Sequence, residues 1–147
     1  MAGHNAPPDL RSWLQRLAAT DRLAVARKGI SLIDELAAIS KKLELERAVM
    51  FPQPGGHAMT VVSNLFVDRC WVADSIGVPT EHLLTRFQQA VRQPLPWTEV
   101  KNAAAQEVVH REVDLLKLLP IPKHNEHDSG PYITAALLIA RNPKTEI

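Results

Sequence analysis

The amino-acid sequence predicts an α+β fold, and three observations lead to this prediction. Apolar residues recur at helical spacing in several stretches, and short apolar runs typical of strands lie between them without a strict strand–helix–strand repeat. The stretch PQPGG at residues 52–56 separates two such runs, and its prolines and glycines favour a turn that pairs them antiparallel. The chain of 147 residues, 46% hydrophobic and 22% charged, has the size and composition of one globular domain.

The first helix is predicted to follow Asp9, whose carboxylate can accept hydrogen bonds from the free amides of the first helical turn. Residues 23–26 then form a short apolar run that predicts a strand. Ser31 and Asp34 resemble a capping box, which predicts that a second helix opens there. Apolar residues at helical spacing mark the inner faces of these helices: Leu10, Trp13, Leu14 and Leu17 in the first, and Leu32, Ile33, Leu36, Ala37, Ser40 and Leu43 in the second.

Two strands and two helices are predicted next. A buried strand is expected at residues 48–51, directly before a proline, and a second within residues 59–66. A third helix is expected over residues 67–76 and should end at Gly77, because glycine is favoured just after a helix C-terminus. Thr80 is the expected N-cap of a fourth helix. The predicted inner face of that helix comprises Leu83, Leu84, Phe87 and Val91.

The last third of the chain has less regular patterns. Residues 97–100 and 107–110 are expected to be extended, and residues 113–119 to form a turn of helix. Residues 132–140 are almost continuously apolar, which is typical of a strand buried on both faces; left unpaired, such a strand would drive self-association. We expect a cut after Pro122 to give a better-behaved monomer, because the cut falls in a proline-marked loop outside the first core.

Charge and composition exclude several classes of function. The net charge is +1 and no run of five basic residues occurs, so we expect no nucleic-acid partner. No stretch approaches the roughly 18 apolar residues of a transmembrane helix, so we expect no membrane association. Cys70 is the single cysteine, which excludes an intrachain disulfide and fits a cytoplasmic protein. We expect it to be a small core or boundary residue rather than a nucleophile.

The residues able to bind a metal gather in one stretch, residues 124–128, with the sequence HNEHD. Imidazole and carboxylate groups can hold zinc or iron. The spacing is not that of a helical His-Glu-x-x-His array, and a polar loop uses the same residue types for turns, so we predict that no metal binds here. A metal-dependent hydrolase built on His124, His127 and Asp128 stays an alternative, and it would need a further ligand such as His57 or His110.

The segment LPIPKHNEHDSGPYIT, residues 119–134, resembles a passage of the UbiD family, the prenylated-FMN-dependent (de)carboxylases. That passage reads Leu-Pro-Ile-Pro, then His, then Asp-x-Gly-Pro-Tyr-Ile-Thr. Four further stretches resemble the family in the same order, although Val67 stands where the family has glycine after Asn-Leu-Phe. These stretches are DLRSWLQRLAATDRL at residues 9–23, AVMF at 48–51, SNLF at 63–66 and VDLLKLLPIP at 113–122.

The resemblance implies two units in a polypeptide longer than this chain. Residues 1–119 would form an N-terminal mixed α/β domain, and residues 120–147 a linker and the first strand of a flavin-reductase-like split β-barrel, which is truncated here. The implied protein is a reversible decarboxylase of aromatic or α,β-unsaturated carboxylic acids. Its catalytic and metal-binding residues are expected beyond Ile147, so we predict no catalytic residue and no metal ligand within the chain, and no activity for the chain alone.

The resemblance also implies the cofactor and the assembly. The longer protein would use prenylated FMN with a divalent metal, Mn or Mg, and a monovalent cation, none of which this chain alone should bind tightly. Thr134 is the one expected cofactor-binding position, although a core threonine satisfied by the backbone explains it equally well. The longer protein is expected to be a homo-oligomer, a dimer or a hexamer. The alternative is a free-standing, non-catalytic subunit or interaction module of the same fold.

Overall fold

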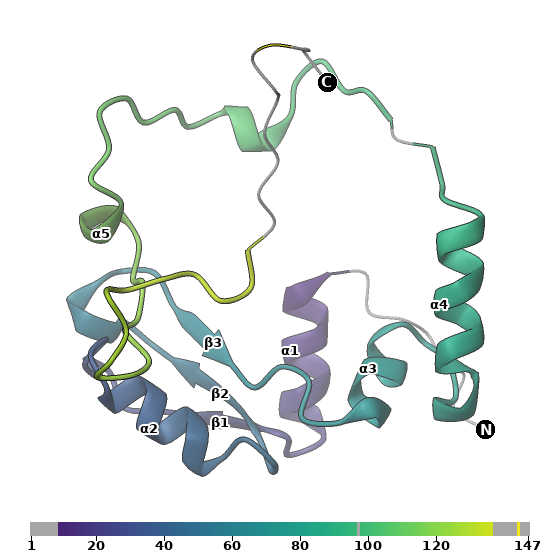
Figure 1. The fold of residues 1–147 in the computed structure, drawn as a ribbon, viewed down its shortest axis with the longest axis horizontal. Helices are drawn as coiled ribbons and strands as arrows, with labels where there is room; N and C mark the ends of the chain where they lie inside the picture. The colour runs from purple at the N-terminus through teal and green to yellow at the C-terminus, as the bar shows by residue number, and fades with distance from the viewer. Residues whose placement is uncertain (1–8, 97, 137–143, 145–147) are drawn as a thin grey trace.

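The computed structural model describes residues 9–96, 98–136 and 144. Its centre is a three-stranded sheet in the order β1–β2–β3 (Figure 1). The strands are β1 (Leu23–Val25), β2 (Ala48–Phe51) and β3 (Val61–Ser63). β2 pairs antiparallel with β3, as the PQPGG turn predicts, with Met50 opposite Val62.

The first two strands add a parallel pair to the predicted architecture. β1 and β2 run parallel, with Ala24 opposite Val49, and α2 (Glu35–Lys42) connects them. This is a strand–helix–strand unit, which the α+β prediction did not include. The described fold is therefore a mixed α/β arrangement in which one parallel pair and one antiparallel pair share β2.

Four more α-helices accompany the sheet: α1 (Leu10–Ala19), α3 (Arg69–Ser75), α4 (Leu83–Arg92) and α5 (Leu115–Leu118). Short 3-10 turns lie at Pro54–Gly56, Thr80–His82 and Ala104–Gln106. α4 stands apart from the sheet, and the chain between α4 and α5 runs as a wide arch above it (Figure 1). None of the helices in the described part of the chain is long and apolar enough to cross a membrane.

Aspartates cap the starts of three described helices, with Asp114 accepting the Leu116 amide at α5. Asp9 caps α1 as predicted, since its Oδ1 accepts the Ser12 amide at 2.8 Å. α3 begins two residues later than predicted, because Asp68 takes the capping position and accepts the amides of Cys70 at 2.8 Å and Trp71 at 3.1 Å. Gly77 follows α3 with a φ of 70°, the left-handed conformation that favours glycine.

The predicted capping box before α2 is wrong, because Ser31 pairs with Glu35 and not with Asp34. Asp34 has a φ of 61° and makes no capping hydrogen bond. Instead, the carboxylate of Glu35 accepts the Ser31 amide at 2.8 Å, and the Ser31 hydroxyl accepts the Ile33 amide at 3.1 Å. α2 thus opens at residue 35, three residues later than a Ser31–Asp34 box requires. Similarly, Thr80 starts a 3-10 turn rather than capping α4.

β2 supplies both hydrophobic clusters, because alternate residues of a strand point to opposite faces of the sheet. Ala48 belongs to one cluster, and Val49 and Phe51 to the other. This confirms the prediction of a buried strand at residues 48–51. The first cluster contains Trp13, Leu17, Ala48 and Trp71, with Cys70 packed at its boundary as expected, and the second contains Ile30, Leu36, Val49 and Phe51.

The predicted inner face of the fourth helix is exposed. α4 forms within the expected range, yet the side chains of Leu84, Phe87 and Val91 are 59%, 65% and 67% exposed. Helical spacing identifies the apolar side of a helix but not what covers it. The stretches expected to be extended, residues 98–100 and 107–110, contain no strand, and the only regular element described between residues 98 and 110 is a 3-10 turn. Trp97 lies outside the described residues.

Residues 119–124 return to the loop that leads into α2 and are held there by backbone hydrogen bonds. The Lys123 amide donates to the Leu32 carbonyl at 2.9 Å, and the Asp34 amide donates to the Lys123 carbonyl at 3.3 Å. Pro120 is buried. The expectation that this loop lies outside the first core is therefore wrong. Of the strand predicted at residues 132–140, residues 132–136 contain no strand, and residues 137–140 lie outside the described residues.

Acid is expected to destabilise this fold. Four carboxyl groups have pKa values below their ordinary values, because hydrogen bonds stabilise the charged form. Since the unfolded chain takes up these protons at higher pH than the folded chain, the free energy of unfolding should fall as the pH drops through the ordinary values of 3.8 for aspartate and 4.5 for glutamate. The groups are Asp9, Asp21, Glu35 and Asp68, whose main donors are the Ser12 amide, the Arg47 guanidinium, the Ser31 amide and Cys70.

Thermal unfolding recorded from about pH 7 to about pH 3 measures this effect. Asp68→Asn keeps an oxygen that can cap α3 but removes one titrating group. The variant should therefore lose less stability than the parent protein between neutral and acid pH. Identical pH dependence for both proteins would contradict the assignment to Asp68.

Candidate functional site

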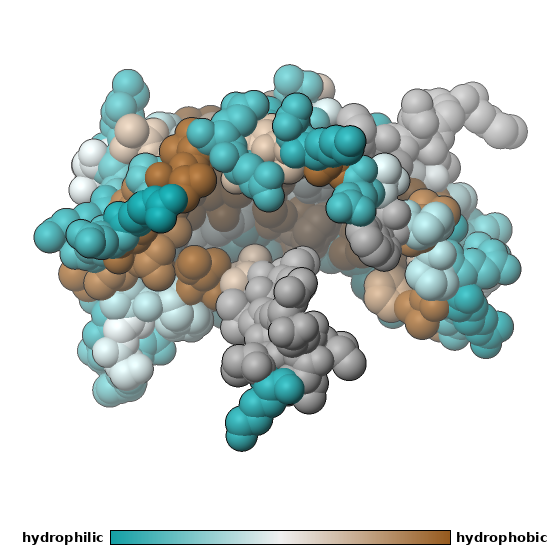
Figure 2. Space-filling view, turned by 90° about the horizontal axis from the view of Figure 1, so that it is seen from above, coloured by the Kyte–Doolittle hydropathy of each residue, from teal (hydrophilic) through white to brown (hydrophobic). Residues whose placement is uncertain are grey.

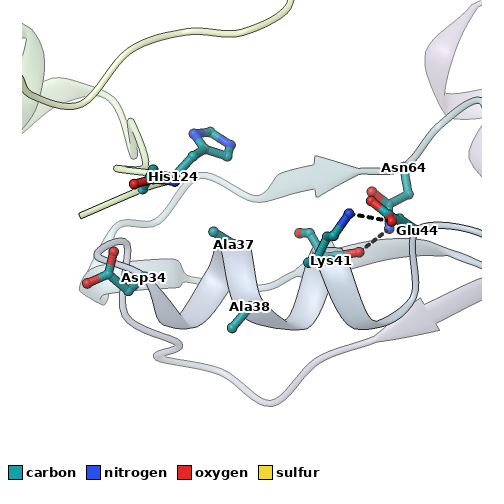
Figure 3. Close-up of a pocket in the computed structure, with 9 residues that line it drawn as sticks. Asp34, Ala37, Ala38, Lys41, Glu44, Asn64 and His124 are labelled. Atoms are coloured by element: carbon teal, nitrogen blue, oxygen red, sulfur yellow. Dashed lines mark hydrogen bonds and ion pairs between the residues drawn. The ribbon is translucent and has the colours of Figure 1, made fainter. Parts of the chain in front are cut away.

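An open depression of about 540 Å³ lies between α2 and the returning segment that carries His124 (Figure 3). Asn64, just after β3, forms its far side. The Asn64 side chain donates to the Ser40 carbonyl at 2.7 Å and to the Arg47 carbonyl at 3.3 Å, which ties β3 to the end of α2. The depression is lined by Asp34, Ala37, Ala38, Ser40, Lys41, Glu44, Asn64, His124 and Asn125.

The charged groups in this depression are largely engaged with one another. Lys41 Nζ lies 2.6 Å from Oε1 of Glu44, which stands in the turn just after α2. The amide nitrogen of Asn64 is committed to two backbone carbonyls. The two carboxyl groups of the lining, Asp34 and Glu44, lie at opposite ends of α2 (Figure 3), and the Ser40 hydroxyl is hydrogen-bonded to the Ser63 hydroxyl rather than to a base. We assign no reaction to this depression.

His124, already a candidate from the sequence, is the member of the HNEHD stretch whose ring is turned towards a neighbouring aromatic side chain. Its ring faces Tyr132, with the ring centres 5.5 Å apart and the planes at 45°. Its Nδ1 is buried, and within the described part of the chain it has no hydrogen-bond partner. About sixty positions of sequence separate His124 from Asn64 and more separate it from α2, so no local spacing could predict that they meet.

The HNEHD stretch folds into a turn that uses its own polar groups. Asp128 accepts the Asn125 amide at 2.9 Å, and the side-chain oxygen of Asn125 accepts the His127 amide at 3.0 Å. The His127 side chain is 87% exposed and lies 3.4 Å from a Glu126 carboxylate oxygen. Among the described residues, which include His57 and His110, no three potential ligands gather. The geometry thus gives no support to the hydrolase alternative.

The other two candidates lie apart from the depression. The pKa of the Cys70 thiol is raised, chiefly by its hydrogen bond with Asp68 and then by burial. A raised pKa keeps the thiol protonated at neutral pH, which disfavours a nucleophilic role. Thr134 lies in an exposed turn at residues 134–135. Its contact with a cofactor stays a prediction.

Two family models match the chain. Residues 14–91 match the 3-octaprenyl-4-hydroxybenzoate carboxy-lyase N-terminal domain, and residues 98–147 match the Rift-related domain of the same enzymes. The chain belongs to the UbiD family. The resemblance that residues 119–134 suggest is thereby confirmed.

Relatives of the UbiD chain include known decarboxylases. It is 32% identical over 133 residues to the anhydromevalonate phosphate decarboxylase of Methanosarcina mazei, covering 88% of this chain and 29% of that protein. It is also 32% identical over 144 residues to an uncharacterized protein of the cooM 5′ region of Rhodospirillum rubrum, covering 95% of this chain and 31% of that one. The chain thus spans about a third of the length of these relatives.

A solved structure agrees with the described fold. The UbiD-class enzyme HmfF from Pelotomaculum thermopropionicum, in an evolved dimeric form in complex with prFMN, superposes with a TM-score of 0.85 at 38% identity. The match covers 94% of this chain and 33% of that chain. A second structure of HmfF, in complex with FMN, matches with a TM-score of 0.84.

Proposed function

We propose that this chain is the N-terminal part of a cytoplasmic, reversible, prenylated-FMN-dependent decarboxylase that acts on an aromatic or α,β-unsaturated carboxylic acid. One observation carries the proposal: 94% of the chain superposes, at 38% identity, on an enzyme of the UbiD class in complex with prFMN. The decarboxylases among the sequence relatives support the same reaction type.

The proposed division of labour is the one that the resemblance implies, with its boundary at residue 119, whereas the second family model matches from residue 98. Residues 1–119 would be the N-terminal domain, and residues 120–147 the linker and the first strand of a split β-barrel that binds the flavin. The packing of residues 119–124 on the first unit supports a linker that is fixed in place rather than loose. The longer protein would be a homo-oligomer, which the dimeric form of HmfF supports by analogy.

The described residues do not by themselves fit the implied cofactor. Thr134 offers one hydroxyl group in an exposed turn, and no three metal ligands gather within the described part of the chain. We therefore attribute the binding of prenylated FMN, of Mn or Mg and of a monovalent cation to the part of the relatives that this chain does not cover. Prenylated FMN, when bound there, supplies the electron sink for decarboxylation.

The experiment compares the chain alone with a fusion. In the fusion, this chain replaces the matching third of HmfF, joined to the remainder of that enzyme. With reduced prenylated FMN and a panel of aromatic and unsaturated acids, the fusion should release carbon dioxide and the chain alone should not. Turnover by the chain alone would overturn the proposal, and so would a soluble, cofactor-loaded fusion that is inactive on the whole panel.

Thr134→Val tests the one cofactor position that the sequence predicts. Valine keeps the shape of the side chain but removes the hydroxyl. Loss of one hydrogen bond worth about 0.5–1.5 kcal/mol should weaken prenylated-FMN binding to the fusion about 2- to 10-fold. Thr60→Val, on an exposed loop before β3, is the matched control. Equal affinities for both variants and the parent fusion would assign Thr134 a structural role instead.

A further inference from the structure

β1 forms an open edge of the sheet. Among the described residues it has a strand neighbour on one side only, which is β2. The Arg22 carbonyl accepts a hydrogen bond from β2 at 3.0 Å, and the Ala26 amide donates one to β2 at 2.8 Å. Because the backbone groups of successive residues in a strand point to opposite sides, Ala24 also faces β2. The amides and carbonyls of Leu23 and Val25 therefore point to the open edge.

The side chains of β1 leave room for another strand. Val25 is 64% exposed, although Leu23, two positions earlier on the same face, packs against the cluster that contains Trp13. Ala24 lies on the opposite face of the sheet and has a small side chain, which lets another backbone approach closely. An exposed edge with apolar side chains can accept a further strand.

The open backbone groups select one register for a second copy of the same strand. In an antiparallel pair about a two-fold axis, the outward-facing residues must form the hydrogen-bonded pairs. The register that pairs both of them sets Leu23 opposite Val25 of the second copy and puts the axis at Ala24. Asp21 then stands opposite Arg27 of the second copy. These two side chains carry opposite charges and are 84% and 70% exposed, so they can form a cross-strand ion pair.

We propose that the open edge of β1 is a contact surface between two copies of this chain, which pair antiparallel about Ala24 and join their sheets into one. Each Leu23–Val25 pair exchanges two backbone hydrogen bonds, and the two-fold axis makes two such pairs. Val25 then covers Leu23 of the second copy and extends the apolar cluster across the axis. The proposal rests on the proposed function only in the expectation of a homo-oligomer, for which it names one contact surface.

This edge is separate from the main exposed apolar surface. Figure 2, which looks down on the arch, shows hydrophobic side chains along the arch and in the hollow beneath it. β1 is the strand furthest from the arch (Figure 1). Association through β1 therefore leaves the arch side of the molecule open. Since β1 is short, the dimer of the chain alone should be weak, with a Kd on the order of 100 µM.

Disulfide cross-linking tests the register. In a Cys70→Ser background, Ala24→Cys puts a thiol on the proposed axis, where the two Cα atoms of a non-hydrogen-bonded pair are about 4.5 Å apart and can be bridged. Ala26→Cys is the matched control, because its two copies are displaced by about 13 Å along the strands. Under mild oxidation, Ala24→Cys should form the linked dimer at least about tenfold faster than Ala26→Cys.

A proline in the edge tests the same contact without a thiol. Val25→Pro removes an amide that points away from β2, so the sheet should form while the pairing between copies is lost. Val108→Pro, at an exposed position far from β1, is the matched control. Light scattering from about 10 µM to about 1 mM should show a rising mass for the parent and for Val108→Pro, and at least about tenfold weaker association for Val25→Pro.

Equal cross-linking rates for the two cysteine variants would overturn the proposal, as would a parent chain that stays monomeric over the whole concentration range. Association that Val25→Pro leaves unchanged would also overturn it, because another surface must then join the copies. If Ala24→Cys harms folding, the comparison of the two proline variants decides. Since none of these measurements needs cofactor or turnover, the contact can fail while the proposed reaction stands, and the reverse.

Discussion

Phe51→Ala is expected to lower the free energy of unfolding by about 3–5 kcal/mol. The Phe51 side chain is completely buried in the cluster formed with Ile30, Leu36 and Val49. Alanine removes most of that contact area and leaves a cavity between β2 and α2 that the short strand cannot close. Since small domains have only about 5–15 kcal/mol of stability in total, a large part of the variant should be unfolded at moderate denaturant concentration.

Phe87→Ala is the matched control, because it makes the same chemical change on a side chain that is 65% exposed. Its effect on the chain alone should stay within about 0.5 kcal/mol. Urea denaturation followed by tryptophan fluorescence measures both variants, since Trp13 and Trp71 lie in the other buried cluster. If both substitutions lower the free energy of unfolding by the same amount, the packing around Phe51 does not contribute the stability expected of a buried side chain.

The local features of this fold could be predicted from the sequence because they depend on residues close together in the chain. The strand at residues 48–51 has the predicted bounds, and Asp9 and Gly77 mark the ends of helices as expected. These signals act within a few positions, through a capping carboxylate or a left-handed glycine. Where a nearby competitor exists, they fail by two or three residues: Glu35 displaces Asp34 as the partner of Ser31 before α2, and Asp68 moves the start of α3.

The non-local features could not be predicted in this way. The parallel pairing of β1 with β2 depends on the path of α2 across the sheet, and no short turn marks it in the sequence. The apolar stripe of α4 is visible in the sequence, but the absence of a covering element among the described residues is not. For the site, the sequence singles out His124 for its ligand chemistry, whereas the structure turns its ring towards Tyr132.

Truncation of the chain after Leu118 is expected to lower the free energy of unfolding by about 2–4 kcal/mol. The cut removes buried Pro120 and the half-buried residues around it. It also removes the two backbone hydrogen bonds of Lys123, one to Leu32 and one from Asp34. Loss of these bonds frees the loop that leads into α2, whose first turn has no side-chain cap from Asp34.

Truncation after Gly130 is the matched control, because it keeps residues 119–124 and the turn closed by Asp128. Its stability should lie within about 1 kcal/mol of the full chain, since it removes mainly exposed residues from the described part. A cut after Pro122 should be less stable than the cut after Gly130, because Lys123 is lost while the prolines stay. Chemical denaturation and light scattering on all three truncations show whether residues 119–124 stabilise the fold or lie outside its core. If the cut after Pro122 gives the most stable monomer, residues 123–130 contribute nothing to the first unit, and the contacts of Lys123 do not hold the segment at the loop that leads into α2.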